Sequence, residues 1–132
     1  MELKDKIKNL KGPIFIFGAS GFIGINLLLK ILSIRDDCYA ITHSKSAWRL
    51  EMNKIPKDKI LFCNITSKSN VDYIFSKYNP LTVFNLATYG SNSSEQQTDL
   101  VYNTNIIGTL NILENCNECV YIHAGSSSEY GI

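Results

Sequence analysis

Three glycines between two apolar stretches constrain this chain more than any other feature. The run Gly18-Ala-Ser-Gly21-Phe-Ile-Gly24 follows the apolar residues 14–17 and opens a second apolar stretch, 25–32. A buried strand, a glycine turn and a helix in that order make the phosphate-binding element of a dinucleotide fold. The spacing is G-x-x-G-x-x-G, whereas the common fingerprint is G-x-G-x-x-G. We therefore interpret this run as a nucleotide site, and the alternative is a purely structural turn.

The three glycines have different expected roles. Gly18 lets the chain turn sharply off the strand, and Gly21 lets the backbone approach a pyrophosphate with no Cβ in the way. Gly24 lets the helix lie close to the sheet. Free N–H groups and the positive end of the helix dipole then face the phosphates. The predicted cofactor contacts of this turn are Gly18, Ser20, Gly21, Phe22, Ile23 and Gly24.

Length and charge exclude several classes of protein. The 132 residues suffice for one domain, 1–132, and are too few for two. A formal charge of +1 gives no indication of nucleic-acid binding. Asn26 and Lys30 interrupt the longest apolar stretch, so no membrane span is expected. Residues 1–13 are charged and lack the apolar core of a secretory signal, which favours a cytoplasmic protein.

The N-terminal residues have two open interpretations. Leu3, Ile7 and Leu10 recur at helical spacing, which indicates a short amphipathic helix packed on the domain. A frayed, solvated tail is the alternative.

Four cysteines are expected to be reduced thiols, because nothing indicates secretion. Cys116 and Cys119 form a C-x-x-C pair, which also occurs in metal and redox sites. A zinc site needs four ligands, and the two histidines, His43 and His123, lie in other segments. A redox pair is expected at a helix N-terminus, whereas this pair follows a helix.

Strands alternate with helices along the chain, which predicts a parallel sheet with right-handed crossovers. The predicted fold is an α/β Rossmann-type doubly wound sheet of about five strands, with helices on both faces. A long helix is predicted from about Glu95 to Asn115, with Tyr102, Ile106, Leu110 and Leu113 as its apolar stripe. The expected strands are 14–17, 38–42, 60–63, 82–87 and 120–124, and the other expected helices are 22–34 and 69–78, with one helical turn in 47–52.

Four segments together resemble the extended short-chain dehydrogenase/reductases, specifically the NAD(P)-dependent nucleotide-sugar epimerases and dehydratases. The glycine run is similar to that family's glycine motif. Phe84-Asn-Leu-Ala87 resembles the strand end whose backbone passes near the cofactor, which assigns Leu86 and Ala87 to the cofactor site. Asn105-Ile-Ile-Gly-Thr109 resembles the family's N-x-x-G-T segment and adds Asn105. Ser126-Ser-Ser-Glu-Tyr-Gly131 resembles the segment that carries the catalytic Ser/Thr.

The resemblance implies hydride transfer from a sugar carbon of a nucleotide sugar to the nicotinamide. A tyrosine with a lysine four residues later would act as base, and a Ser/Thr hydroxyl would hydrogen-bond the same sugar oxygen. Counting back four residues from Tyr130 gives Ser126 as the catalytic hydroxyl, or Ser127 if a one-residue gap intervenes. The alternative is a serine-rich turn with no catalytic role. Tyr130 itself is expected to be structural.

The Tyr/Lys pair is expected some twenty or more residues beyond Ser126, whereas the sequence ends at Ile132. The sequence contains one Y-x-x-x-K, Tyr73 to Lys77, which precedes the fourth strand. There Tyr73 is expected to be a partly buried side chain without a catalytic role. The chain thus resembles the N-terminal, cofactor-binding portion of a longer enzyme and is expected to be inactive alone. The family resemblance leaves a homodimer open for the whole enzyme.

The choice between NADP and NAD depends on the end of the second strand. NAD-preferring members carry an acidic residue there, but this chain has Thr42-His43-Ser44-Lys45 and then Arg49, with no carboxylate before Glu51. His43, Ser44, Lys45 and Arg49 therefore predict a 2′-phosphate site and NADP. The alternative is that Lys45 and Arg49 are solvated loop charges. Asn64 and Ile65 stand where relatives often have Asp and a hydrophobic residue, and the Asn64 amide oxygen could accept from an adenine amine.

The residues of the catalytic turn bear on which reaction the chain's family resemblance implies. The dehydratase branch carries Thr, Asp/Ser and Glu in succession, whereas this chain has Ser126, Ser127 and Ser128 with the glutamate one place late at Glu129. Elimination of water is therefore less supported than epimerisation or keto reduction. A non-catalytic NAD(P)-sensing module on the same fold is the alternative function.

Overall fold

Five short strands form one parallel sheet in the order β3-β2-β1-β4-β5. The computed structural model describes residues 2–43 and 47–131. The predicted Rossmann-type sheet is confirmed. The strands are β1 (Ile14–Phe17), β2 (Cys38–Thr42), β3 (Ile60–Phe62), β4 (Thr82–Asn85) and β5 (Val120–His123).

The central strand β1 is buried on both faces, which explains its unbroken apolar run. Successive side chains of a strand point to opposite faces of the sheet. Ile14 and Ile16 accordingly belong to one apolar core, and Phe15 and Phe17 belong to the other. A run of alternating polar and apolar residues would expose one of these faces to water.

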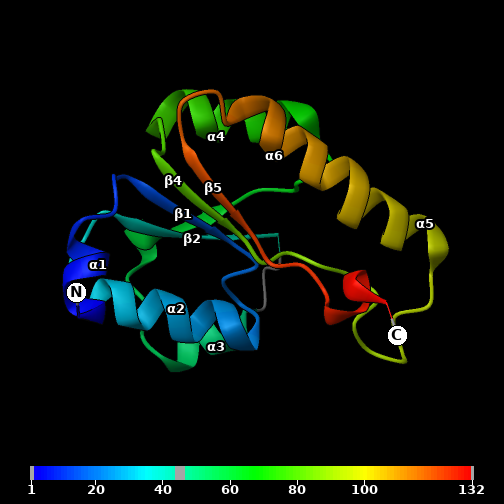
Figure 1. Ribbon diagram of the computed structural model, residues 1–132, viewed down its shortest axis with the longest axis horizontal. Coiled ribbons are helices and arrows are strands. Elements are labelled where there is room, and N and C mark those ends of the chain that lie inside the picture. Colours follow the sequence, from blue (N-terminus) through cyan, green and yellow to red (C-terminus); the bar gives the residue numbers. More distant parts are fainter. Residues whose placement is uncertain (1, 44–46, 132) are drawn as a thin grey trace.

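Helices cover both faces of the sheet, as predicted. Figure 1 shows α2 and α3 on one face and α4 and α6 on the other. Asn79 ends α4 in the left-handed conformation, with φ 47°, directly before Pro80. The α-helices are α1 (Leu3–Lys8), α2 (Phe22–Leu32), α3 (Trp48–Met52), α4 (Lys68–Tyr78), α5 (Thr98–Tyr102) and α6 (Thr109–Asn115). The 3-10 helices are η1 (Lys57–Lys59) and η3 (Ser127–Tyr130), and a π-helix, η2 (Asn103–Gly108), joins α5 to α6.

The N-terminal segment is a helix packed on the domain, and not a solvated tail. Ile7 of α1 is buried in the same core as α2. The Arg35 guanidinium donates through Nη1 to the carbonyl oxygens of Ile7 at 3.1 Å and Leu10 at 2.6 Å. These bonds join the end of α1, and the residues just after it, to the segment between α2 and β2.

The predicted apolar stripe of the long helix is wrong as a core face. Tyr102, Ile106, Leu110 and Leu113 are all exposed, with Tyr102 at 55%. The buried residues of this helix are Gly108, Asn111 and Ile112. The helix also begins at Thr98, three residues later than expected, because the Glu95 carboxylate accepts the backbone N–H groups of residues 90–92 and holds that loop.

The prediction of four reduced thiols is wrong for one pair. Cys116 and Cys119 form a disulfide between the end of α6 and the start of β5, with their Cα atoms 5.1 Å apart. This separation lies within the range that disulfides allow. Cys38 and Cys63 are free and buried. Within the described residues, no three His, Cys, Asp or Glu side chains gather into a potential metal site, and no helix is long and apolar enough to cross a membrane.

Candidate functional site

The strand order reverses between β1 and β4, which run side by side although β2 and β3 lie between them in the sequence. In open parallel sheets of this kind, ligands bind outside the carboxyl ends of the strands at such a reversal. The loops that follow the five strands meet there. The glycine turn follows β1, and the other predicted site residues follow β2, β3, β4 and β5.

Gly18 and Gly24 are required by the packing of the turn itself. Gly18 has φ +75°, and a Cβ there would lie 2.7 Å from the carbonyl group of Leu86 at the end of β4. A Cβ at Gly24 would collide with the Gly18 carbonyl oxygen and lie 2.7 Å from the Cα of Ala19. The first glycine therefore fits the turn against β4, and the third fits α2 against the turn.

Gly21 differs, because the protein leaves space around it. Its φ is −74°, which any residue adopts, and among residues 2–43 and 47–131 a Cβ there would meet only the Gly18 carbonyl oxygen, at 3.2 Å. Within the part of the chain that the structure describes, no side chain caps the start of α2, and its first turn carries no acidic residue. Phe22 and Ile23 are 74% and 66% exposed. The turn therefore presents uncapped N–H groups and open apolar surface, which suits an anionic ligand with an apolar part.

Arg49 places a positive charge beside the glycine turn. Its Nη1 donates to the carbonyl oxygen of Ser20 at 3.2 Å, although 29 positions separate the two residues. Its guanidinium also stacks over the ring of Trp48, 4.4 Å from the ring centroid. His43 is exposed at the end of β2. Ser44 and Lys45, which the sequence also assigns to this site, lie outside the described residues.

The turn between β3 and α4 differs in detail from the sequence-based interpretation. The Asn64 Oδ1 accepts from the Thr66 N–H at 3.1 Å and the Thr66 hydroxyl at 2.9 Å, so both of its lone pairs are engaged. An adenine amine would have to replace one of them. The carbonyl oxygens of Asn64 and Ile65 accept from Ser67 and Asn111. Within residues 2–43 and 47–131, the N–H of Ile65 has no acceptor.

Asn105 supports the loop after β4. Its Oδ1 accepts from the Tyr89 N–H at 2.9 Å, and its Nδ2 donates to the Tyr89 carbonyl oxygen at 2.8 Å. Leu86 and Ala87 lie at the start of this loop, where the Leu86 N–H donates to the Phe17 carbonyl oxygen at 3.0 Å. The structure therefore brings Leu86 next to the glycine turn and gives Asn105 a supporting contact with the loop backbone.

A buried polar group at the ends of β4 and β5 was missed from the sequence. Asn85 is 1% exposed, and its Nδ2 donates to the Tyr121 hydroxyl at 3.0 Å and the Thr109 hydroxyl at 3.3 Å. The Tyr121 hydroxyl lies 3.1 Å from the His123 Nδ1. Burial raises the pKa of Tyr121. The signal was the single asparagine inside the apolar run 82–87.

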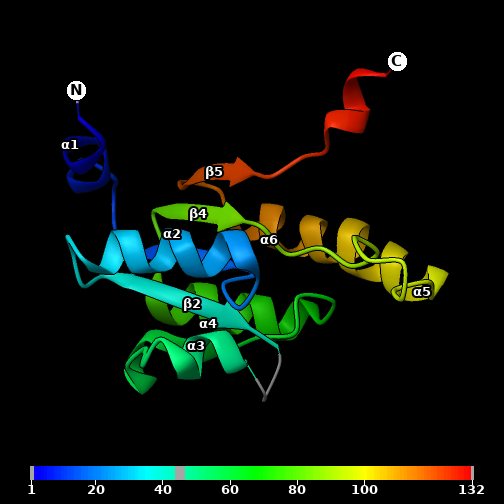
Figure 2. The ribbon, with the colours of Figure 1, turned by 90° about the horizontal axis from the view of Figure 1, so that it is seen from below.

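Ser126 caps the 3-10 helix η3. Its Oγ accepts from the Ser128 N–H at 3.2 Å, and the Glu129 Oε1 accepts from the Ser126 N–H at 2.9 Å. The Ser126 hydroxyl keeps its own proton for donation. Figures 1 and 2 show this segment extending beyond the end of β5. The structure thus gives Ser126 a place in a serine-rich turn, and no acceptor for its hydroxyl proton lies among the described residues.

The one Y-x-x-x-K of the sequence lies on the solvent side of α4. The Lys77 Nζ donates to the Tyr73 hydroxyl at 3.3 Å, and this bond raises the pKa of Lys77. Tyr73 is 59% exposed, so the expectation of a partly buried side chain is wrong. The pair belongs to an exposed helix surface, where such contacts contribute little.

The fold and the open glycine turn define a dinucleotide-binding protein of the Rossmann class. Residues 14–132 match the family described as the NAD dependent epimerase/dehydratase family. The chain belongs to this family.

Solved structures agree with this assignment. A UDP-glucose 4-epimerase from Thermotoga maritima, solved with UDP-glucose, is 25% identical with a TM-score of 0.71, and the match covers 87% of this chain and 38% of that one. An L-threonine dehydrogenase from Clostridium difficile is 26% identical with a TM-score of 0.76, over 89% and 37%. A UDP-glucose 4-epimerase from Thermus thermophilus, in complex with NAD, is 23% identical with a TM-score of 0.64, over 78% and 33%. No curated protein sequence matches the chain.

Proposed function

We propose that this chain is the cofactor-binding portion of an NAD(P)-dependent enzyme that transfers a hydride at a sugar carbon of a nucleotide sugar. The open glycine turn carries the proposal. Gly18 and Gly24 are explained by internal packing, but Gly21 is not, and a pyrophosphate against its backbone would explain it. The chain spans 38% or less of the length of the three neighbours described above, so the activity belongs to the whole protein.

The residues around the turn fit a dinucleotide. The N–H groups at the start of α2 would bind the pyrophosphate, and the Ile65 N–H would donate to a ring nitrogen of the adenine. Arg49 would bind a 2′-phosphate, which supports NADP over NAD as the cofactor. Phe22 and Ile23 would contribute apolar contact. A bound nicotinamide cofactor would supply the hydride acceptor for the substrate carbon.

The catalytic part of the proposal concerns Ser126. Its hydroxyl proton would donate to the sugar oxygen, while its Oγ keeps the contact with the Ser128 N–H. A serine hydroxyl is a poor base at neutral pH, so the proton of the sugar hydroxyl needs another acceptor. The Tyr/Lys pair that the family resemblance implies would supply it from the sequence beyond residue 132. We expect the 132 residues alone to bind cofactor without turnover.

The names of the neighbours include substrates of two kinds, UDP-glucose and L-threonine. A nucleotide sugar is our proposed substrate, because the motifs of the sequence resemble the epimerases. One observation favours the alternative, a non-catalytic NAD(P)-binding module: both polar groups of Ser126 that cap η3 have structural partners. We also propose that the whole protein is cytoplasmic and forms a homodimer. The exposed apolar stripe on the long helix supports the homodimer.

Cofactor binding is tested with Gly21→Ala. The fold accepts this change with a small shift, because φ is ordinary and the new Cβ has one close neighbour. The methyl group would stand between the turn and the pyrophosphate, and losing good hydrogen bonds to a charged group weakens affinity by about tenfold or more. Calorimetry with NADP and NAD measures the loss, and thermal unfolding measures stability.

Lys30→Ala at the far end of α2 is the matched control, because Lys30 is exposed and distant from the turn. It should leave affinity unchanged. Equal affinity of Gly21→Ala and the unmodified protein would contradict the site assignment, and no binding of either dinucleotide to the unmodified protein would contradict the function.

A further inference from the structure

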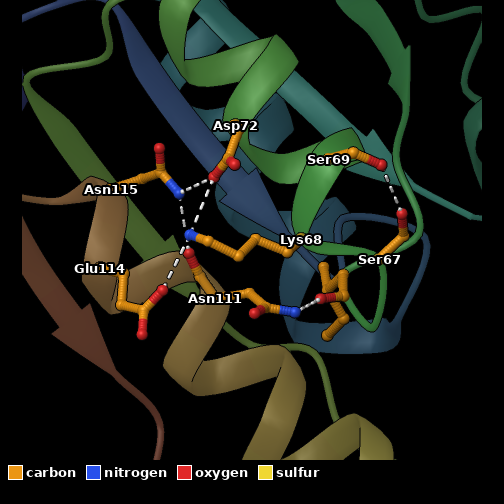
Figure 3. A network of polar contacts seen from close by, with 8 residues as sticks. Ser67, Lys68, Ser69, Asp72, Asn111, Glu114 and Asn115 are labelled. Atoms are coloured by element: carbon orange, nitrogen blue, oxygen red, sulfur yellow. Dashed lines mark hydrogen bonds and ion pairs between the residues drawn. The ribbon is translucent and has the colours of Figure 1, made fainter.

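Asn111 of α6 is a buried polar side chain that none of the sequence motifs explains. It is 8% exposed, and its Nδ2 donates to the carbonyl oxygen of Ile65 at 2.8 Å. The two residues are 46 positions apart. Figure 3 shows this bond joining α6 to the turn between β3 and α4. A helix on one face of the sheet therefore holds the backbone of a loop at its carboxyl edge.

A second contact fixes the same residue from the same helix. A Cβ at Gly108 would lie 2.6 Å from both Cγ1 and Cδ1 of Ile65, so the Ile65 side chain packs directly on the helix backbone. Ile65 is 9% exposed. Its side chain rests on Gly108 and its carbonyl oxygen is held by Asn111, one turn apart on the helix. These two contacts leave the turn little freedom to move.

Two further polar contacts join α6 to α4: an exposed ion pair and a part-buried hydrogen bond. Lys68 at the start of α4 pairs with Glu114 at 2.8 Å, and Asn115 donates to Asp72 at 2.8 Å (Figure 3). Exposed ion pairs contribute little, because water and salt screen them. A buried carbonyl oxygen that loses its partner carries a larger penalty. Asn111 is therefore the polar contact on which the position of the turn depends most.

We propose that Asn111 is a positioning residue for the adenine half of the dinucleotide. It does not touch the ligand. It holds the Ile65 carbonyl group, so that the backbone N–H of the same residue keeps a fixed place at the site. This N–H has no acceptor among the described residues. This inference rests on the proposed function, because it assigns the β3–α4 turn to the adenine half.

The test compares Asn111→Leu with Asn115→Leu. Leucine branches at Cγ as asparagine does, so Asn111→Leu removes the donor without leaving a cavity. Asn115 is the matched control, because it lies one turn further along the same helix and also joins α6 to α4, but it does not contact the β3–α4 turn. Calorimetry measures the affinity for ADP-ribose and, by competition, for inorganic pyrophosphate, which reaches only the glycine turn.

We expect Asn111→Leu to weaken ADP-ribose binding about tenfold, as loss of one well-placed hydrogen bond does, and to leave pyrophosphate binding unchanged. Asn115→Leu should leave both within about twofold. Amide hydrogen exchange should be faster at residues 64–66 in Asn111→Leu alone. If Asn111 had a merely structural role, Asn111→Leu would lower the melting temperature but would not change the affinities for ADP-ribose and pyrophosphate differently.

Gly108→Ala disturbs the same turn through the contact between Gly108 and the Ile65 side chain. This variant tests the inference if Asn111→Leu fails to fold. The new methyl group would push Ile65 away from the helix, so ADP-ribose affinity should again fall while pyrophosphate affinity stays. Unchanged ADP-ribose affinity in the variants that fold, while the unmodified protein binds ADP-ribose, would overturn this inference and leave the proposed function standing. Failure of the unmodified protein to bind ADP-ribose would overturn both.

Discussion

Arg49 connects α3 to the glycine turn through its bond to the Ser20 carbonyl oxygen. This bond holds the guanidinium beside the predicted phosphate site before any ligand arrives, which lowers the entropic cost of binding a 2′-phosphate. Guanidinium is also suited to phosphate, since it can donate two parallel hydrogen bonds. The side chain therefore suits a 2′-phosphate at the edge of the site.

The position of Arg49 leads to a prediction about cofactor preference. NADP should bind more tightly than NAD, and Arg49→Ala should reduce the difference, because a charge-assisted bond to phosphate contributes about 1.5–3 kcal/mol, or roughly tenfold to a hundredfold in affinity. Calorimetry with both dinucleotides measures the ratio. Lys54→Ala is the control, because Lys54 is an exposed cation shortly after α3. Equal affinities for the two dinucleotides in the unmodified protein would refute the NADP preference.

Single residues show why part of the site could be predicted from the sequence and part could not. The positive φ of Gly18 and the contacts of Gly24 with Gly18 and Ala19 are local, so the motif itself encodes them, whereas the contact of Gly18 with Leu86 comes from a distant strand. The cofactor contacts of Asn64 and Asn105 stay predictions, and in the structure their amide groups bind the backbone of Thr66 and Tyr89. Such partners depend on how loops fold in space, and spacing along the chain carries no information about them.

Strand β2 makes a pH-dependent contribution to stability through Cys38. Burial raises the pKa of Cys38 from 9.0 to about 12, and of Cys63 to about 11. A raised pKa in the folded state means that folding favours the neutral thiol. The stability from this preference is complete below pH 9 and is lost as the pH rises towards 12.

We therefore expect the free energy of unfolding to fall more steeply above pH 9 than below it. Cys38→Ala removes one of the two buried thiols. The free energy of unfolding of this variant should therefore fall less steeply above about pH 9, and between about pH 7 and 8 it should depend on pH as that of the unmodified protein does. Denaturant unfolding at a series of pH values measures both. If the free energy of unfolding fell equally steeply with pH in both proteins under alkaline conditions, Cys38 would not be the cause of the fall.

At the level of elements, apolar runs predicted the strands well because β1, β2 and β4 are buried and alternate between two cores. The long helix was harder to predict. Its buried side is made of Gly108, Asn111 and Ile112, which look less apolar than its exposed side. Gly108 allows a close approach to Ile65 and Asn111 satisfies a carbonyl group there, and both reasons come from a distant segment.

Among the described residues, the long helix leaves a row of apolar side chains uncovered. Tyr102, Ile106, Leu110 and Leu113, together with Leu100, are exposed along one helix. Contiguous apolar surface of this kind marks an interaction site more often than a solvated face. The strand order places the proposed cofactor site at the carboxyl ends of β1 and β4, and the same helix carries both the stripe and Asn105 of that proposed site.

The stripe supports the prediction that the protein self-associates. Light scattering at increasing protein concentration should show a species larger than the monomer, and Leu110→Glu should shift it to the monomer, because a buried charge without a partner is costly. Tyr73→Glu on α4 is the control, as it changes an exposed aromatic side chain elsewhere. A monomer at all concentrations for the unmodified protein would contradict this prediction.

Trp48 is the only tryptophan of the chain, and it is 53% exposed with the Arg49 guanidinium over its ring. Any ligand that engages Arg49 must therefore alter the surroundings of the sole indole. Trp48 is therefore an intrinsic optical probe of the proposed cofactor site. Intrinsic fluorescence can follow occupancy on the timescale of mixing, with no label attached, and a reduced nicotinamide nearby would act as an energy acceptor for the excited indole.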